Sequence, residues 1–144
     1  MPRGHAEMAC YSPRAMAGLT KNSPLPTDIL LHQQTRRLEV TFSDGARFEY
    51  SFEFLRVHSP SAEVRGHGPG QEVLQTGKRG VEISALEPVG NYAVQPTFSD
   101  GHATGIYSWD YLYELGQRHD MMWAEYLARL ASAGASRDQP SGHA

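Results

Sequence analysis

Hydrophobic and polar residues alternate in two stretches of the chain, and both stretches run into the same five residues. Positions 37–42 place their apolar side chains on one face, which is the period-two pattern of a half-buried strand. Positions 92–98 alternate in the same way, and Thr-Phe-Ser-Asp-Gly occurs both at 41–45 and at 97–101. Because Asp-Gly between apolar runs is typical of tight hairpin turns, the pattern predicts two hairpins.

A helix is predicted after each hairpin. The run Tyr50–Leu55 parallels the run Tyr107–Leu112, and the serine after each tyrosine can accept a hydrogen bond from a free first-turn N–H. The second copy has one more residue between its threonine and its tyrosine, which predicts a bulge or a longer turn there. His102 of the second copy stands where the first copy has Ala46. The sequence therefore predicts two strand–turn–strand–helix units.

The segments around these units are less regular. Residues 28–34 are expected to form a short helix or turn, and a strand is expected to begin near residue 81. The strand that carries Pro96 is expected toward a sheet edge, because proline has no N–H to donate. Residues 58–72 lack periodicity and are rich in glycine and proline, which predicts a long loop.

The apolar period becomes helical after Ser108. One helix is expected to end at Gly116, and a second helix is expected to begin at Asp120 and to end at Gly134. The predicted fold class is α+β. It consists of a small, mostly antiparallel sheet built from two hairpin–helix units, with the C-terminal helices packed on one face.

The ends of the periodic patterns give the domain boundaries. Residues 1–27 contain four prolines and no apolar period, so they are expected to be a disordered tail. The polar residues 135–144 are expected to be a second disordered tail. The predicted domain therefore covers residues 28–134.

Composition and charge narrow the class of protein. A length of 144 residues fits one domain with one core. The formal net charge of −3 argues against a nucleic-acid binder, which would carry a concentrated basic surface. The single cysteine provides no disulfide framework, and no apolar stretch approaches the roughly 18 residues of a membrane helix. Because a signal-peptide pattern is also missing, the expected location is the cytoplasm.

Several enzyme classes fail on motif spacing. A phosphate-binding loop needs Gly-Lys followed by Ser or Thr, but Arg79 follows Gly77-Lys78. An iron oxygenase needs two histidines and a carboxylate, and the only His-x-Asp/Glu lies at His5-Ala6-Glu7 in the predicted tail. No Gly-x-Ser-x-Gly nucleophile motif occurs. An acid–base pair of Glu87 and Asp100 stays open, but the sequence favours a protein without catalytic activity.

Histidines give the strongest metal hypothesis. His58, His67 and His102 could converge if the long loop folds over the sheet, and with Glu63 or Asp100 they would suit a divalent transition metal. The simpler interpretation is that His102 hydrogen-bonds locally while the other two histidines are solvated. The spacing matches no standard ligand pattern.

Three blocks of the sequence resemble one known family. The blocks are Leu55–Glu63 (with Ser-Pro-Ser-Ala-Glu), Glu87–Val94 (Glu-Pro-Val-Gly-Asn-Tyr-Ala-Val) and Phe98–Leu112, which contains Phe-Ser-Asp-Gly-His and Gly-Ile-Tyr-Ser-Trp. Together they are similar to the gamma-butyrobetaine hydroxylase-like N-terminal domain family, in its stand-alone bacterial form. The similarity spans roughly residues 29–134.

The resemblance implies several contexts for such a domain. Related domains occur alone in bacteria, at the N-terminus of carnitine-pathway 2-oxoglutarate oxygenases, and attached to Mrp-type P-loop ATPases that handle iron–sulfur clusters. The catalytic iron of the oxygenases lies in a separate jelly roll that this sequence does not contain. The resemblance therefore implies no oxygenase activity for this chain.

The oxygenase modules also hold a structural zinc, through three cysteines in a Cys-Pro-Cys-x-x-Cys loop and one histidine. The resemblance places these cysteines at Ser59, Ser61 and Val64, and the histidine at His102. Thiolate-type zinc binding is thus lost, because serine is a poor zinc ligand and valine is none. A weaker site for iron or zinc, with His102 beside other histidines or Glu63, stays open.

The leading hypothesis is a non-catalytic, stand-alone binding or accessory domain, linked to iron–sulfur or metal handling through a protein partner such as an Mrp-type ATPase. The alternative is a metal-binding regulator or small enzyme that uses His102 as an iron or zinc ligand. Loop and turn residues carry recognition on a rigid scaffold. The predicted binding residues are Arg56, Asn91, Asp100, His102 and Tyr107.

Overall fold

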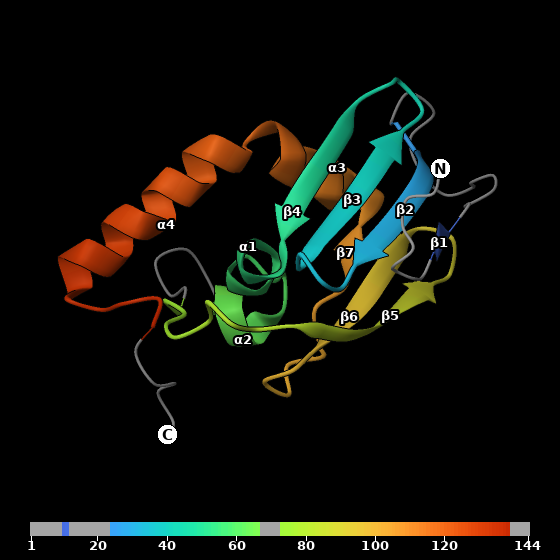
Figure 1. The fold of residues 1–144 in the computed structure, drawn as a ribbon. Helices are drawn as coiled ribbons and strands as arrows, with labels where there is room; N and C mark the ends of the chain where they lie inside the picture. Colours follow the sequence, from blue (N-terminus) through green and yellow to red (C-terminus); the bar gives the residue numbers. More distant parts are fainter. Residues whose placement is uncertain (1–9, 12–23, 67–72, 139–144) are drawn as a thin grey trace.

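The computed structural model describes residues 10–11, 24–66 and 73–138. It consists mainly of two units, each made of three strands followed by a helix (Figure 1). The first unit comprises β2 (Pro26–His32), β3 (Arg37–Phe42), β4 (Arg47–Ser51) and α1 (Phe52–Val57). The second comprises β5 (Ile83–Val89), β6 (Ala93–Phe98), β7 (Tyr107–Ser108) and α3 (Trp109–Gln117). The other elements are β1 (Cys10–Tyr11), α2 (Ala62–Arg65) and α4 (His119–Ala133).

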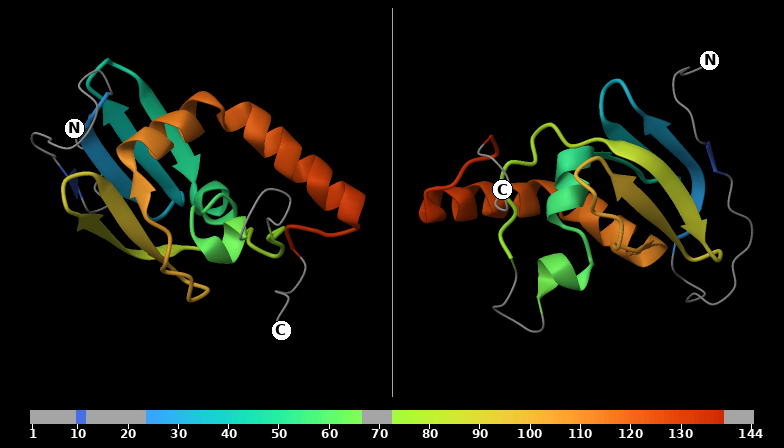
Figure 2. Two further views of the ribbon diagram at one scale, coloured as in Figure 1. Left: turned by 180° about the vertical axis from the view of Figure 1, so that it is seen from behind. Right: turned by 90° about the horizontal axis from the view of Figure 1, so that it is seen from below.

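The strands form two antiparallel sheets rather than one. Their orders are β1-β2-β3-β4 and β5-β6-β7. Helix α3 lies beside the first sheet, and α4 extends beyond both sheets in every view (Figures 1 and 2). The α+β class and the antiparallel pairing predicted from the sequence are confirmed.

Both predicted turns have the same backbone. Gly45 and Gly101 have φ values of 91° and 92°, a region that favours glycine because it lacks a Cβ. The Asp44 carboxylate accepts the Ala46 N–H at 3.0 Å, and the Asp100 carboxylate accepts the His102 N–H at 3.2 Å. These bonds are the local side-chain turns that aspartate is known to form.

Both predicted serine caps are confirmed. Ser51 Oγ accepts the Phe54 N–H at 3.0 Å, and Ser108 Oγ accepts the Tyr111 N–H at 3.1 Å. Each cap satisfies a first-turn N–H that has no partner inside the helix.

The two units are joined by a reciprocal pair of buried hydrogen bonds. The Tyr50 hydroxyl donates to the carbonyl of Leu112 at 2.7 Å, and the Tyr107 hydroxyl donates to the carbonyl of Leu55. Tyr50 and Leu55 hold the same places in the first unit as Tyr107 and Leu112 in the second. All four residues are at most 1% exposed, so the junction of the units forms the centre of the core.

Two predictions about strands were wrong. Residues 28–34 were expected to be a helix or turn, but most of them belong to β2, where Ile29 and Leu31 point into the core. Strand β6 was expected at an edge because of Pro96, yet it lies between β5 and β7. The proline is tolerated because β7 is short and pairs only with Ala93 and Val94.

Two predicted helix ends also differ. Gly116 lies inside α3, where a Cβ would come within 2.3 Å of the Phe48 ring, so close packing rather than helix termination requires glycine there. Helix α4 begins at His119 without a side-chain cap, and Asp120 is an exposed residue of its first turn. Gly134 ends α4 in the left-handed conformation, as predicted.

The predicted tails and loop contain some ordered structure. Strand β1 and the first residues of β2 fall within the predicted N-terminal tail, and the rest of that tail lies outside the described residues. Arg137 forms an ion pair with Glu53, and Asp138 with Arg79, within the predicted C-terminal tail. The predicted loop 58–72 holds α2, while its residues 67–72 are not described. No helix in the described part of the chain is long and apolar enough to span a membrane.

Candidate functional site

The second unit departs from the first at one place. In the first unit β4 begins at Arg47, directly after Ala46, whereas residues 103–106 of the second unit, which follow His102, belong to no strand. The extra residue predicted for the second copy falls in this region, before β7 begins at Tyr107. Residues 102–106 instead contact the loop that joins α1 to α2.

Ser59, His102 and Glu63 form a continuous hydrogen-bonded chain at this contact, called here the Ser–His–Glu chain. Ser59 Oγ lies 2.9 Å from His102 Nε2, and His102 Nδ1 lies 2.9 Å from Glu63 Oε1. A carboxylate can only accept, so Nδ1 carries the proton and Nε2 accepts from the serine hydroxyl. Ser59 Oγ also accepts the Ser61 N–H at 3.2 Å.

Two further contacts tighten this region. The hydroxyls of Ser61 and Thr104 lie 2.7 Å apart. A Cβ on Gly105 would lie only 2.3 Å from Ser59 Oγ, so the backbone of residues 102–106 approaches the loop as closely as glycine allows.

A cluster of charged side chains, two of them buried, lies beside the Ser–His–Glu chain. The Asp100 carboxylate accepts hydrogen bonds from Arg56 Nε at 2.9 Å and from Lys78 Nζ at 2.6 Å. Arg56 and Lys78 are only 7% and 8% exposed. Burial opposes ionisation of Asp100, but the hydrogen bond from Lys78 and the charge of Arg56 outweigh it and hold its pKa below the usual value.

His102 is neutral in this setting. Burial lowers its pKa, and the positive charge of Arg56 lowers it further, while Glu63 only partly offsets them. The order Ser–His–Glu matches that of a hydrolase triad, but the exposure is reversed. Ser59 is 1% exposed, whereas the Glu63 side chain is 65% exposed. In a hydrolase the serine must reach the substrate, so this arrangement suits a structural link better than nucleophilic attack.

Four of the five predicted binding residues come together here. Arg56, Asp100, His102 and Tyr107 surround the contact between the units, but Arg56, His102 and Tyr107 are 7%, 5% and 1% exposed. These three therefore do not form an exposed recognition surface. Asn91 lies apart in the exposed turn between β5 and β6, where its carbonyl accepts the indole N–H of Trp109 at 2.9 Å.

Lys78 was not predicted as part of the site. It belongs to the Gly-Lys-Arg run, whose spacing does not match a phosphate-binding loop. No sequence period marks residues 73–80, and only the fold brings Lys78 to the carboxylate of the second turn.

Two of the three histidines predicted to converge have different surroundings. The His58 ring packs against Phe54 and Tyr126, and its Nδ1 lies 3.0 Å from the Phe54 carbonyl. It therefore has different neighbours from His102, and His67 lies outside the described residues. Within the described ranges no three His, Cys, Asp or Glu side chains gather in a way that could hold a metal ion. The role of His102 as a ligand stays a prediction.

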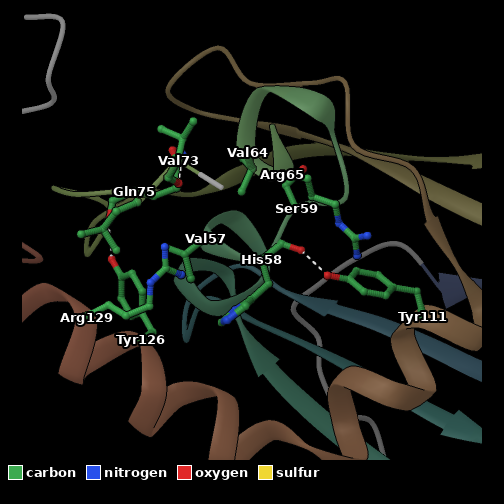
Figure 3. A pocket seen from close by; sticks show the side chains of 11 residues that line it. Val57, His58, Ser59, Val64, Arg65, Val73, Gln75, Tyr111, Tyr126 and Arg129 are labelled. Atoms are coloured by element: carbon green, nitrogen blue, oxygen red, sulfur yellow. Dashed lines mark hydrogen bonds between the residues drawn. The ribbon is translucent and has the colours of Figure 1, made fainter. Parts of the chain in front are cut away.

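A groove opens between α2 and α4, and Ser59 lines it as well as belonging to the Ser–His–Glu chain (Figure 3). Its volume is about 130 Å³, and the side chains that line it among the described residues are Val57, His58, Ser59, Val64, Arg65, Val73, Leu74, Gln75, Tyr111, Tyr126 and Arg129. We call it the α2–α4 groove. Most of these side chains are apolar or aromatic, the two arginines are exposed, and no carboxylate is among them.

Hydrogen bonds fix the aromatic walls of the α2–α4 groove. The Tyr111 hydroxyl donates to the His58 carbonyl at 2.6 Å, and the Tyr126 hydroxyl donates to the Gln75 carbonyl at 2.8 Å (Figure 3). The Arg65 guanidinium stacks over the Tyr111 ring, 5.0 Å from its centroid. Burial lowers the pKa of His58 and raises that of Tyr126 to about 12, so both are neutral at pH 7.

Comparison with known proteins places this two-unit α+β domain in a family. The family model described as gamma-butyrobetaine hydroxylase-like, N-terminal, matches residues 29–113. The chain belongs to this family, as the resemblance predicted. No protein of curated function matches it.

Solved structures share the fold. Two NMR solution structures are 49% and 50% identical to the chain, with TM-scores of 0.71 and 0.70. The matches cover 82% and 83% of this chain and 93% and 91% of those chains. A crystal structure of a protein of unknown function from Acidithiobacillus ferrooxidans, assigned to the DUF971 family, is 41% identical with a TM-score of 0.54. It covers 63% of this chain and 91% of that one, which fits a stand-alone form of the domain.

Proposed function

We propose that the chain is a non-catalytic binding domain whose α2–α4 groove receives an acidic and apolar segment of a partner protein. The observation that carries the proposal is the pair of exposed arginines, Arg65 and Arg129, beside an apolar groove. Neither forms an ion pair with any residue that the structure describes. A partner carboxylate would neutralise them, and apolar partner side chains would cover Val73, Leu74 and Tyr111, which are exposed or half-buried.

The burial of potential catalytic groups supports the proposal that the domain is non-catalytic. Ser59 is the one serine hydroxyl hydrogen-bonded to a histidine in the described part of the chain, and it is 1% exposed. If Ser59 has no chemical role, Ser59→Ala should leave hydrolysis of an activated ester such as p-nitrophenyl acetate at the wild-type rate. A clear loss of hydrolysis in a folded Ser59→Ala protein would contradict this part of the proposal.

The partner that we propose to test first is an Mrp-type iron–sulfur ATPase. Its support is the family membership, because related domains are expected to occur attached to such ATPases. The domain would then serve iron–sulfur handling as an accessory module rather than as a cluster carrier. Native co-purification from the source cells, followed by binding measurements with the purified ATPase, tests this choice of partner.

Charge reversal at the groove tests the binding surface separately from the partner. Arg65→Glu/Arg129→Glu should weaken binding of the ATPase by about tenfold or more, or ~1.4 kcal/mol, and should abolish its salt dependence. Arg37→Glu is the matched control, because Arg37 is an exposed arginine that does not line the groove. Equal binding by all three proteins would place the interface elsewhere, whereas no binding by any of them would reject the ATPase.

The rival proposal is a metal-binding regulator or small enzyme with His102 as an iron or zinc ligand. Its support is the position of His102, which matches the zinc histidine that the resemblance implies. A metal would have to replace Ser59 or Glu63 as a partner of the ring. Stoichiometric iron or zinc in the untagged protein, lost in His102→Ala, would favour this rival proposal over the binding domain.

A further inference from the structure

The four positions at which the resemblance implies zinc ligands lie together in this chain. Ser59 contacts His102 directly, and Ser61 contacts Ser59 through its backbone N–H. Val64 is 6% exposed on α2, one residue after the Glu63 that holds the other side of the His102 ring. The loop that carries three of these positions therefore lies against His102, although three of the four side chains are not zinc ligands.

The side chains present do not fit a zinc ion. A structural zinc takes four nitrogen or sulfur ligands in a tetrahedron. Here two of the four positions are hydroxyls and one is the apolar Val64. The fourth, His102, uses both ring nitrogens in hydrogen bonds. The described residues offer no replacement group of three ligands.

We infer that hydrogen bonds between the loop and the second hairpin, called here the hydrogen-bonded closure, take the place of the metal in this chain. We also infer that cysteines at positions 59, 61 and 64 would turn the same four positions into a zinc site. Proton donors and acceptors match along the whole closure: Ser61 N–H to Ser59 Oγ, Ser59 O–H to His102 Nε2, and His102 Nδ1–H to Glu63. The Ser61–Thr104 hydroxyl pair adds a second link between the same two segments. These bonds join the loop to the second hairpin as a shared ion would.

Cysteines at positions 59, 61 and 64 would supply three thiolate ligands, and His102 would complete a Cys3His set. Ser59 and Val64 also line the α2–α4 groove, but the inference does not depend on partner binding there.

The first test is made on the wild-type protein, expressed without a histidine tag. We expect no stoichiometric zinc or iron by elemental analysis, and no change in melting temperature when EDTA or zinc is added. Stoichiometric metal that His102→Ala removes would overturn the inference and would favour the rival proposal. Unfolding by EDTA would also overturn it.

The second test is the Ser59→Cys/Ser61→Cys/Val64→Cys variant, with cobalt(II) as a spectroscopic probe. We expect the thiolate charge-transfer and tetrahedral cobalt bands, and a melting temperature that rises with zinc and falls again with EDTA. The same variant with His102→Ala should bind cobalt more weakly, by at least the roughly 10–100-fold that changes around a metal site commonly cost.

The cobalt experiment tests the geometry of the four positions, and the metal content of the wild-type protein tests the hydrogen-bonded closure. A folded triple-cysteine variant that binds no cobalt would overturn the convertible geometry. If the variant does not fold in either the presence or the absence of zinc, the geometry is likewise rejected, since zinc binding should drive folding of a competent site. The metal content of the wild-type protein decides the hydrogen-bonded closure in every case.

Discussion

The turns of the two units make the same backbone and serine hydrogen bonds at matching positions, but their aspartates contact different side chains. The Ser43 N–H donates to the Leu25 carbonyl at 2.8 Å, and the Ser99 N–H donates to the Glu82 carbonyl at 2.7 Å. Each serine hydroxyl then accepts an N–H from that same residue, at 3.1 Å from Leu25 and 2.9 Å from Glu82. The shared sequence thus determines the backbone of both turns.

The aspartates of the two turns have different surroundings. Asp44 accepts a hydrogen bond from the Tyr113 hydroxyl at the surface. Asp100 instead binds Arg56 and Lys78, which are both buried. The comparison shows that the local sequence sets the geometry of a turn, whereas the elements packed around it decide whether the turn becomes part of a site. It also gives matched pairs of positions for experiments.

The largest expected effect is the loss of charge at Asp100. Asp100→Asn keeps the size of the side chain but leaves Arg56 and Lys78 without a carboxylate partner among the described residues. Removing one partner of a buried ion pair leaves an uncompensated buried charge. We expect the free energy of unfolding to fall by about 3 kcal/mol, because Asp100 is partly exposed and belongs at the lower end of such effects. Urea denaturation measures this change.

Asp44→Asn is the matched control for Asp100→Asn. It alters the same turn position in the first unit, where the carboxylate has no cation partner among the described residues. We expect a much smaller loss of stability. Equal losses at the two positions would show that the aspartates act only through their turns and that the buried charge cluster adds nothing.

The next effect concerns the close approach of residues 102–106 to the loop. A Cβ on Gly105 would meet Ser59 Oγ at 2.3 Å, so Gly105→Ala must push the two segments apart. Overpacking of this kind costs about 2 kcal/mol. Differential scanning calorimetry should show a lower melting temperature, and NMR should show displaced signals at His102.

Two further variants make the Gly105 prediction specific. Gly80→Ala places a methyl group where no atom lies within 4 Å, so it should leave stability almost unchanged. Adding Ser59→Ala to Gly105→Ala should recover part of the loss, because it removes the atom that clashes. Purely additive losses in the double variant would argue against this contact.

The reciprocal tyrosines test the symmetry of the two units. Tyr50→Phe and Tyr107→Phe each remove one buried hydrogen bond to a leucine carbonyl of the other unit. We expect similar losses of about 1 kcal/mol in the free energy of unfolding. Tyr113→Phe, which removes a surface hydrogen bond, should cost less than either. A large difference between Tyr50→Phe and Tyr107→Phe would mean that one unit dominates the junction.

The duplicated fold was predictable from sequence because its signals are local. Repeated turns, serine caps and strand alternation depend on neighbouring residues, and all of them are confirmed. Strand β2 was missed because the run Ile29-Leu30-Leu31 hides its alternation. The repeat itself could have revealed it, since β5 at Ile83–Val89 lies, to within one residue, at the same distance before the second turn as β2 does before the first.

The site was only partly predictable because its contacts are long-range. Arg56, Asp100 and His102 were identified from family-like blocks, but nothing in the sequence showed that Arg56 and His102 would be buried. Lys78 and the α2–α4 groove depend on how α1, α2 and α4 pack, and no local pattern encodes that packing. Sequence reasoning therefore located the junction of the units more readily than the exposed surface beside it.

The smallest expected effect is a pH dependence that the first turn cannot have, because Ala46 occupies the place of His102. The unfolded chain binds a proton at the ordinary histidine pKa of about 6.5. Burial and the charge of Arg56 lower the pKa of His102 in the folded chain, so the folded protein binds that proton only at lower pH. Stability is therefore complete above about pH 6.5 and falls as the pH is lowered through the folded pKa.

Urea denaturation between about pH 7.5 and 5.5 measures this slope for the wild type and for His102→Gln. His58→Gln must be measured beside it, because burial also lowers the pKa of His58 and its contribution has the same sign. We expect each variant to remove part of the slope, and we expect His102→Gln alone to shift NMR signals of Ser59 and Glu63. A His102→Gln protein with the full wild-type slope would mean that burial and the charge of Arg56 do not hold His102 neutral.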